Sequence, residues 1–427
     1  FGTLAGKSTT TADYNVAVGQ EALEANTTGA SNVAIGFRAL EANTTASGNT
    51  GLGYDALGDN TTGDLNVAVG HNSLIANTTA SNNTAVGQNA LATNTTGANN
   101  TAIGRASLDA NTTASHNTAV GVNALGANTT GAEHVAIGSR ALQANTTGAD
   151  NTAAGFSALK ANTTGSYNCA FGGNALIANN TGANNIAVGY DALAANTTGS
   201  QNTAVGHQAL DANTAGAYNQ AFGQHTLTTN TTGDYNSAFG WGALFSNTTA
   251  DGNTAIGNLA LYTNSTGENN TAVGYNALND NTSASNNVAV GKDALAATTT
   301  GASNVAVGSN ALDANTTGTL SVAIGLQALT VSTTAGENTA VGAAAGRYVG
   351  SGQYNTAIGR SSMHSSVSGS TGQMTGDNNT AVGYDSLFTH TTGDDNTAIG
   401  SRSLYLNTTG GNNTAVGRSS LAANTTG

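Results

Sequence analysis

The sequence predicts an all-β fold, a parallel β-solenoid in which the chain winds into stacked coils of 17 residues. The motif Asn-Thr/Val-Ala-Val/Ile-Gly begins at residue 15 and recurs every 17 residues to residue 355, then at 379, 396 and 413. Its glycine is present in all 24 copies, and the 427 residues contain no proline. A ladder of stacked strands needs nearly every backbone N–H group, and proline has none to donate. The unit is also too short for a helical hairpin repeat.

We number the repeat from the asparagine that opens the motif, so the consensus is N-[TV]-A-[VI]-G-x-x-A-L-x-x-N-T-T-G-x-x. Positions 1–5 hold small and β-branched residues, which predicts a strand. The glycine of position 5, first seen at Gly19 and Gly36, permits a sharp bend. Ala-Leu at positions 8 and 9 predicts a second short strand, and Asn-Thr-Thr-Gly predicts the closing turn. We expect about 24 such coils, stacked about 4.8 Å apart.

Stacking places identical residues in columns along the solenoid. The leucines of position 9, beginning with Leu23, Leu40 and Leu57, are expected to form the hydrophobic core. The asparagines of position 12, such as Asn26 and Asn43, and those of position 1 are expected to form amide ladders. Charged residues fall mostly at the variable positions, which indicates solvated edges.

Positions 3 and 4 point to opposite faces of the predicted strand. Position 3 is alanine in all copies but one, as at Ala17 and Ala34, and position 4 is Val, Ile, Leu or Phe in 23 of the 24 copies. Because neither column contains a polar residue, the strand is expected to be buried on both sides, as parallel strands usually are. A solenoid has one interior, so we expect a homo-oligomer, most simply a trimer, with one of these columns at the interface.

The segment 32–36, Asn-Val-Ala-Ile-Gly, and its copies resemble the head repeats of trimeric autotransporter adhesins. The combination with Ala-Leu and Asn-Thr-Thr-Gly is similar to repeats of phage tail fibres and other bacterial surface proteins. The resemblance covers nearly the whole chain, although the adhesin repeat is typically shorter. It implies a left-handed β-roll, often trimeric, in an extracellular fibre used for attachment.

Composition and motifs argue against several other functions. The net charge is −13 without a basic stripe, so nucleic-acid binding is not expected, and no long apolar run predicts a membrane span. The seven histidines form no metal-spaced pair, one cysteine cannot make a thiolate cluster, and no nucleophile or phosphate-loop pattern occurs. We therefore expect no enzyme activity and no cofactor. The Asn-Thr-Thr triplets match the glycosylation motif, but their place in the repeat favours a structural role.

The expected domain organisation is a single solenoid over 1–427, with an incomplete first coil at 1–14. Residues 343–378 depart from the repeat and contain a 7-residue insertion, interpreted as a tolerated surface loop or as a lateral contact. The candidate lateral contacts are Arg347, Tyr348, Met363 and Met374. No cap is evident, so coils at the two ends are candidates for end-to-end strand addition. The candidate end contacts are Phe1, Gly2 and Gly427.

These patterns favour a structural extracellular fibre or filament subunit on a cell surface or virion, in a surface filament, adhesin shaft or tail fibre. Its expected partners are copies of itself and a cell-surface or carbohydrate receptor. The alternative is a ligand-binding solenoid. Tyrosines before the strand, such as Tyr14 and Tyr167, would bind sugar rings. Threonine columns would bind ice, although position 2 mixes threonine with valine and other residues.

Overall fold

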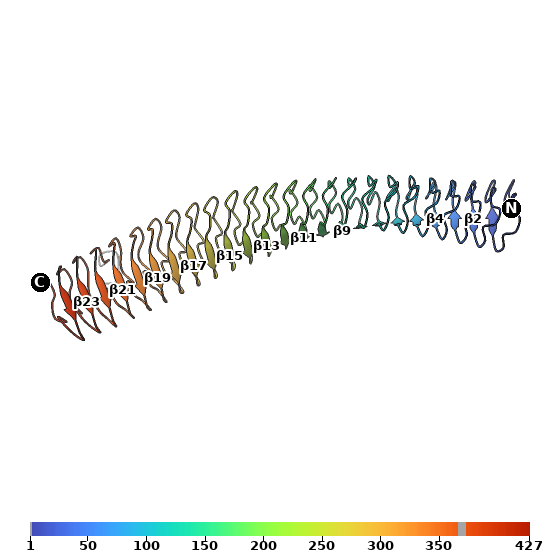
Figure 1. Ribbon diagram of the computed structural model, residues 1–427. Coiled ribbons are helices and arrows are strands. Elements are labelled where there is room, and N and C mark those ends of the chain that lie inside the picture. Colours follow the sequence, from blue (N-terminus) through green and yellow to red (C-terminus); the bar gives the residue numbers. More distant parts are fainter. Residues whose placement is uncertain (1, 366–372) are drawn as a thin grey trace. The chain divides into compact units, whose positions relative to one another are not determined.

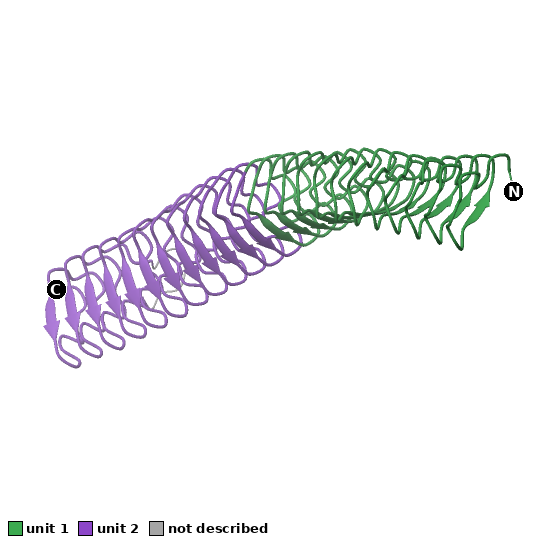
Figure 2. Cartoon of the chain, turned by 45° about the vertical axis from the view of Figure 1, so that its right-hand side comes forward, with its two compact units in different colours: residues 1–215 green, residues 216–427 purple. Residues whose placement is uncertain are grey.

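The computed structural model, which describes residues 2–365 and 373–427, is an all-β parallel solenoid (Figure 1). Each coil of about 17 residues contributes one strand of three residues, and the described residues form 24 strands. The chain divides into two compact units, Phe1–Ala215 and Gly216–Gly427, which Figure 2 colours separately. Across the described part of the chain, no helix has the length and apolar character to cross a membrane.

Unit 1 contains the strands β1 Val16–Val18, β2 Val33–Ile35, β3 Thr50–Leu52, β4 Val67–Val69, β5 Thr84–Val86, β6 Thr101–Ile103, β7 Thr118–Val120, β8 Val135–Ile137, β9 Thr152–Ala154, β10 Cys169–Phe171, β11 Ile186–Val188 and β12 Thr203–Val205. Unit 2 contains β13 Gln220–Phe222, β14 Ser237–Phe239, β15 Thr254–Ile256, β16 Thr271–Val273, β17 Val288–Val290, β18 Val305–Val307, β19 Val322–Ile324, β20 Thr339–Val341, β21 Thr356–Ile358, β22 Thr380–Val382, β23 Thr397–Ile399 and β24 Thr414–Val416. All of them occupy positions 2–4 of the repeat.

Within each unit, consecutive strands pair in parallel and in register, so that position meets position. Ala17 of β1, for example, lies opposite Ala34 of β2. The 7-residue insertion does not disturb this register, because Thr356 of β21 lies opposite Thr380 of β22. Hydrogen bonds run in both directions along the stack. The N–H of position 2 donates to the following coil, and the N–H of position 5 donates to the preceding coil.

The second strand predicted at positions 8 and 9 is wrong, because this part of the coil is a series of turns. The carbonyl of Gly36 accepts from the N–H of Ala39, and the carbonyl of Arg38 accepts from the N–H of Glu41. In both turns the third residue, Arg38 or Leu40, has a positive φ, 56° and 55° respectively. Type II turns require a positive φ at this place. The leucine column is therefore held in left-handed backbone rather than in a strand.

Burial offsets the strain of this leucine conformation. A non-glycine residue in left-handed backbone costs about 1–2 kcal/mol, whereas full burial of a leucine contributes about 1.5–3 kcal/mol. Leu23, Leu40 and Leu57 are at most 1% exposed, which confirms the predicted core column. Their N–H groups also remain bonded, as when Leu23 donates to the carbonyl of Ala39 in the next coil. The alanines of position 3 face the same interior, where Ala34 is fully buried and Ala17, in the first strand, is half-buried.

The two asparagine columns are buried and bonded along the stack, but in different ways. At position 12, the side-chain amide of Asn43 donates to the side-chain oxygen of Asn26 over 2.9 Å, the predicted amide ladder. At position 1, the side-chain oxygen of Asn15 instead accepts the backbone N–H of Asn32 over 2.8 Å. Asn32 and Asn43 also both donate to the carbonyl of Ala46, at 2.9 and 3.0 Å. The closing turn is thus fixed by two side chains that sequence reasoning assigned to separate ladders.

The glycine of position 5 is required by backbone conformation and by space. Its φ lies between 119° and 146° throughout, a region that favours glycine. A Cβ atom on Gly19 would lie 2.4 Å from the carbonyl oxygen of Gly36 in the next coil. Side chains are excluded because neighbouring backbones approach too closely here.

Residues 2–14 follow the bonding pattern of the later coils. Gly6, at the leucine position, donates to the carbonyl of Ala22, and Thr10 donates to the carbonyl of Thr27. Phe1 lies outside the described residues. Residues 366–372, within the irregular coil expected at 343–378, also lie outside them.

Candidate functional site

The outward face of the strands, formed by positions 2 and 4, is the most unusual surface of the molecule. Because strand residues alternate in direction, positions 2 and 4 share one side while the alanine of position 3 points inward. Each strand reproduces this pattern, with a buried or half-buried centre between two partly exposed residues, as in β6 (Figure 1). Ile103, Ile137 and Ile256 at position 4 are 41%, 46% and 42% exposed. In the isolated chain this side of the strand is therefore uncovered, contrary to the expectation of burial on both sides.

This strand face carries no charge. None of the residues at positions 2 and 4 is Asp, Glu, Lys or Arg in any of the 24 coils. Solvent-facing strand positions normally alternate with the core as polar residues, yet position 4 is apolar throughout. The single cysteine, Cys169, lies on this face at position 2 of β10 and is half-buried. Burial raises the pKa of its thiol.

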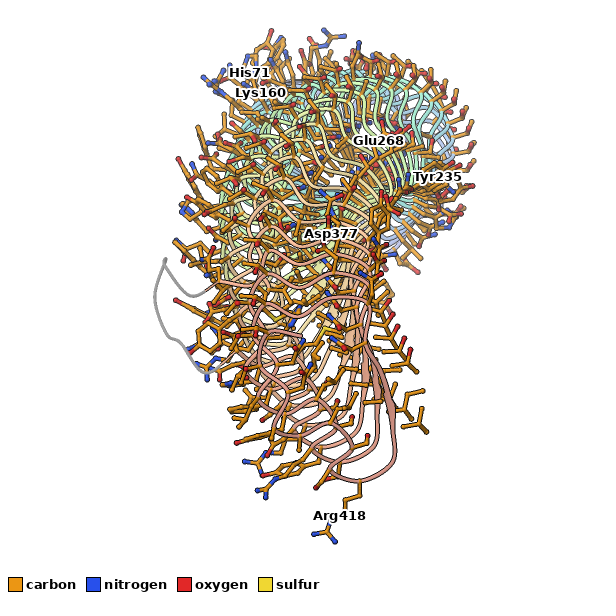
Figure 3. The ribbon with its side chains drawn as sticks, turned by 90° about the vertical axis from the view of Figure 1, so that its left-hand side faces the viewer. His71, Lys160, Tyr235, Glu268, Asp377 and Arg418 are labelled. Carbon is orange, nitrogen blue, oxygen red and sulfur yellow. The ribbon has the colours of Figure 1, made fainter. Side chains whose placement is uncertain are left out.

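Aromatic residues gather along both edges of the strand face, at positions 6 and 17. Phe37, Tyr54 and His71, at position 6 of consecutive coils, stack at centroid distances of 5.1 and 5.0 Å. Tyr218 and Tyr235 at position 17 stack at 4.9 Å, and Tyr235 is labelled in Figure 3. Within such a stack each ring covers its neighbour, so its edge rather than its face meets solvent. Sugar rings bind aromatic faces, so stacking leaves little of these columns for carbohydrate.

The predicted lateral contacts separate into surface and core residues. Met363 and Met374 are fully buried, so assigning them to a lateral contact is wrong. Met363 occupies position 9, where it replaces the core leucine, and Met374 forms a parallel bridge with Val349. Arg347 and Tyr348 are half-buried, and the Arg347 guanidinium lies 5.3 Å from the Tyr348 ring centre. These two remain accessible from outside.

Tyr348 begins an aromatic column outside the strand face, at positions 10 and 11. Its ring meets His364 edge-on at 5.3 Å, and His364 stacks on Phe388 at 5.1 Å. Phe388 in turn stacks on Tyr405 at 5.3 Å. Burial lowers the pKa of His364, and the nearby Arg347 charge acts in the same direction. The rings therefore bridge the irregular coil to the regular coils that follow it.

The candidate end contacts behave as ordinary repeat residues where they are described. Gly2 corresponds to position 5, and a Cβ atom there would lie 2.3 Å from the carbonyl oxygen of Gly19. Gly427 corresponds to position 15, and its carbonyl accepts from the side-chain amide of Asn424. Their end-to-end role stays a prediction.

One acidic cluster is already neutralised by an internal partner. Carboxylate oxygens of Glu21, Glu24 and Glu41 lie within 4.8 Å of one another. The Arg38 guanidinium bonds to Glu41 and lies 3.8 Å from Glu21 and 3.7 Å from Asp55. The cluster lines a shallow hollow of about 400 Å³ with alanines and Gly58. Its charges are balanced by ion pairs, which is how a solvated edge is stabilised.

Two histidines replace ladder asparagines, and one of them reproduces the asparagine bonds fully. The Nδ1 atom of His134 accepts the backbone N–H of Asn151 at 3.1 Å, and Nε2 lies 2.7 Å from the Gly148 carbonyl. Accepting at Nδ1 and donating at Nε2 requires the neutral ring. Burial lowers the pKa of His134, which favours this form. His390, at position 12, donates to Gly393 over 2.7 Å, while its Nδ1 is buried without a partner.

Sequence reasoning missed a further stabilising column at position 16. The Oγ atom of Ser47 accepts the backbone N–H of Ala30 in the preceding coil over 3.1 Å. Ser47 donates its own N–H to Asp64 over 2.7 Å. The frequent Ser and Asp at this variable position were a usable signal, since both side chains commonly bond to nearby backbone.

Comparison with known proteins adds no family to this description. No protein-family model matches the chain, and a search of curated proteins returns no significant match. What is established is a parallel β-solenoid of 17-residue repeats.

Proposed function

We propose that this chain is a structural subunit of an extracellular fibre, in which solenoids associate side by side through the strand face. The fibre is a surface filament, an adhesin shaft or a tail fibre, in line with the resemblance of the repeat to adhesin heads and tail-fibre repeats. The observation that carries the proposal is the uncharged, partly exposed strand face of positions 2 and 4. Large uncharged apolar surfaces on a protein mark sites of association.

A second copy of the chain is the partner that fits this face best. The face repeats once per coil within each unit, so its full complement must repeat with the same spacing. Another solenoid of this sequence has that spacing, and its own strand face is equally free of charge. Covering the exposed two-fifths of each isoleucine would contribute roughly 0.6–1 kcal/mol per residue. Over a dozen coils this exceeds several kcal/mol, which offsets the cost of association.

The test is the mass of the chain in solution. A protomer has a mass of 41.7 kDa, and a trimer would have a mass of about 125 kDa. Ile103→Lys with Ile137→Lys places two charges on the strand face and should give the protomer mass by light scattering. The matched control, Ala92→Lys with Gln143→Lys, adds the same charge at position 10 and should leave the oligomer intact. A wild-type chain that is monomeric at micromolar concentration would refute the proposal.

The cysteine gives an independent test of register. If copies pack with their strand faces together and in register, Cys169 thiols from two copies approach each other, and mild oxidation should yield a disulfide-linked dimer. Gln143→Cys in a Cys169→Ser background moves the thiol to position 10 and should yield far less. Efficient crosslinking of the moved thiol, with none at Cys169, would place the contact elsewhere.

A further inference from the structure

The structure divides the glycosylation motifs of this chain into two classes. Asparagines of the Asn-Thr-Thr triplets stand at position 12, and those of the regular coils are buried. Asn43, for example, is fully buried and its amide donates to Asn26 and to the carbonyl of Ala46. A sugar on this nitrogen would have to displace the ladder. In the folded chain these triplets are structural, as their repetition suggested.

A second set of asparagines lies at position 17, immediately before the strand, and is exposed. All of these residues have left-handed backbone, with φ between 56° and 62°. Five of them begin an Asn-Asn-Thr motif: Asn82, Asn99, Asn269, Asn378 and Asn412. Two others occupy the same position and are equally exposed, but Asn-Asn-Ile and Asn-Asn-Val follow: Asn184 and Asn286. The chain thus contains both acceptor motifs and matched sites that lack them.

The local geometry leaves both required groups of the motif accessible. The middle asparagine of each Asn-Asn-Thr is position 1 and is buried or half-buried, as at Asn83. The threonine, such as Thr84, is position 2 and belongs to the outward strand face. In the described part of the chain the side-chain amides of Asn82, Asn269, Asn378 and Asn412 make no hydrogen bond. The Asn99 amide lies 3.4 Å from His116, which is also exposed.

We propose that the folded chain accepts N-linked oligosaccharides at the five exposed Asn-Asn-Thr motifs and not at the buried position-12 triplets. The donor is an oligosaccharide carried on a polyprenyl diphosphate. A bond forms between the asparagine Nδ2 and C1 of the sugar, and the bond between C1 and the diphosphate oxygen breaks. The amide loses one proton to the enzyme's base, and polyprenyl diphosphate leaves. This inference goes beyond the proposed fibre function and does not depend on oligomer formation.

The experiment treats the purified, folded chain with an oligosaccharyltransferase and lipid-linked oligosaccharide, then maps occupied sites by glycopeptide mass spectrometry. Occupancy should fall on the five motifs, while Asn184 and Asn286 and the position-12 asparagines stay unmodified. No occupancy at the five, or occupancy mainly at position 12, would overturn the inference. A short peptide with the Asn-Asn-Thr motif, run in parallel, verifies that the enzyme is active.

Two substitutions move the site without disturbing the fold. Ile186→Thr creates the motif at Asn184, and Thr271→Val removes it at Asn269. Position 2 holds both threonine and apolar residues across the coils, so the strands tolerate either change. Occupancy should rise from none to a level like that of the native motifs at Asn184 and fall to none at Asn269. Unchanged occupancy at both sites would show that the motif does not direct the modification.

Discussion

Acidification should destabilise the coils around His390, because its ring is held neutral in the folded chain. His390 is fully buried at position 12, and burial lowers its pKa from 6.5 to about 4, against the opposing effects of its bond to Gly393 and of the Asp394 charge. The unfolded chain therefore binds more protons than the folded chain between these values. By linkage, stability falls as pH is lowered through this range. The difference of about 2.5 pH units corresponds to about 3 kcal/mol at 1.36 kcal/mol per unit.

The assay is hydrogen exchange of the strand amides in β22 and β23 between pH 7 and pH 4, corrected for intrinsic exchange rates. His390→Asn restores the consensus residue and removes the titrating group, so its protection should depend less on pH than that of the wild type. His71→Asn removes an exposed histidine in the other unit and serves as the control. The reasoning is refuted if the His390 ring of the folded chain titrates near 6.5 by NMR, or if His390→Asn leaves the pH dependence unchanged.

Three further predictions concern the columns. Gly400→Ala should destabilise the chain by several kcal/mol more than Gly417→Ala, as measured by thermal unfolding, because a Cβ on Gly400 would lie 2.6 Å from the Gly417 carbonyl whereas nothing lies within 4 Å at Gly417. Thr298→Asn should stabilise by about 1–2 kcal/mol in urea unfolding, since the buried side-chain oxygen of Asn281 has no donor. Leu125→Ala should cost about 2–5 kcal/mol in the same assay, because this side chain is fully buried.

Most of the fold was predictable because repetition acts as an internal alignment. The spacing defined the coil, and the constancy of Leu23 and its copies identified the core. The conformation of that leucine was not predictable. Ala-Leu is compatible with a strand, and only the hydrogen-bonded turns around Leu40, with its positive φ, show that burial outweighs the backbone preference.

The candidate site was predicted in part. The alternation of Ala34 with a branched apolar neighbour correctly indicated an inward and an outward strand face. It did not reveal that the outward side is uncovered in one chain, since sequence cannot distinguish burial by the same chain from burial by a partner. Met363 was misassigned because an irregular segment obscured its place at position 9, which only the register with Ser386 makes clear.

The two-way hydrogen bonding between coils has a consequence for how the length of such a chain can change. Each coil offers its successor the same donors and acceptors that it receives from its predecessor. Duplication or deletion of 17 codons therefore alters the number of coils without requiring a new kind of contact. A change of another size must leave the stack and return, as the 7 extra residues between Thr356 and Thr380 do before the strands resume their register.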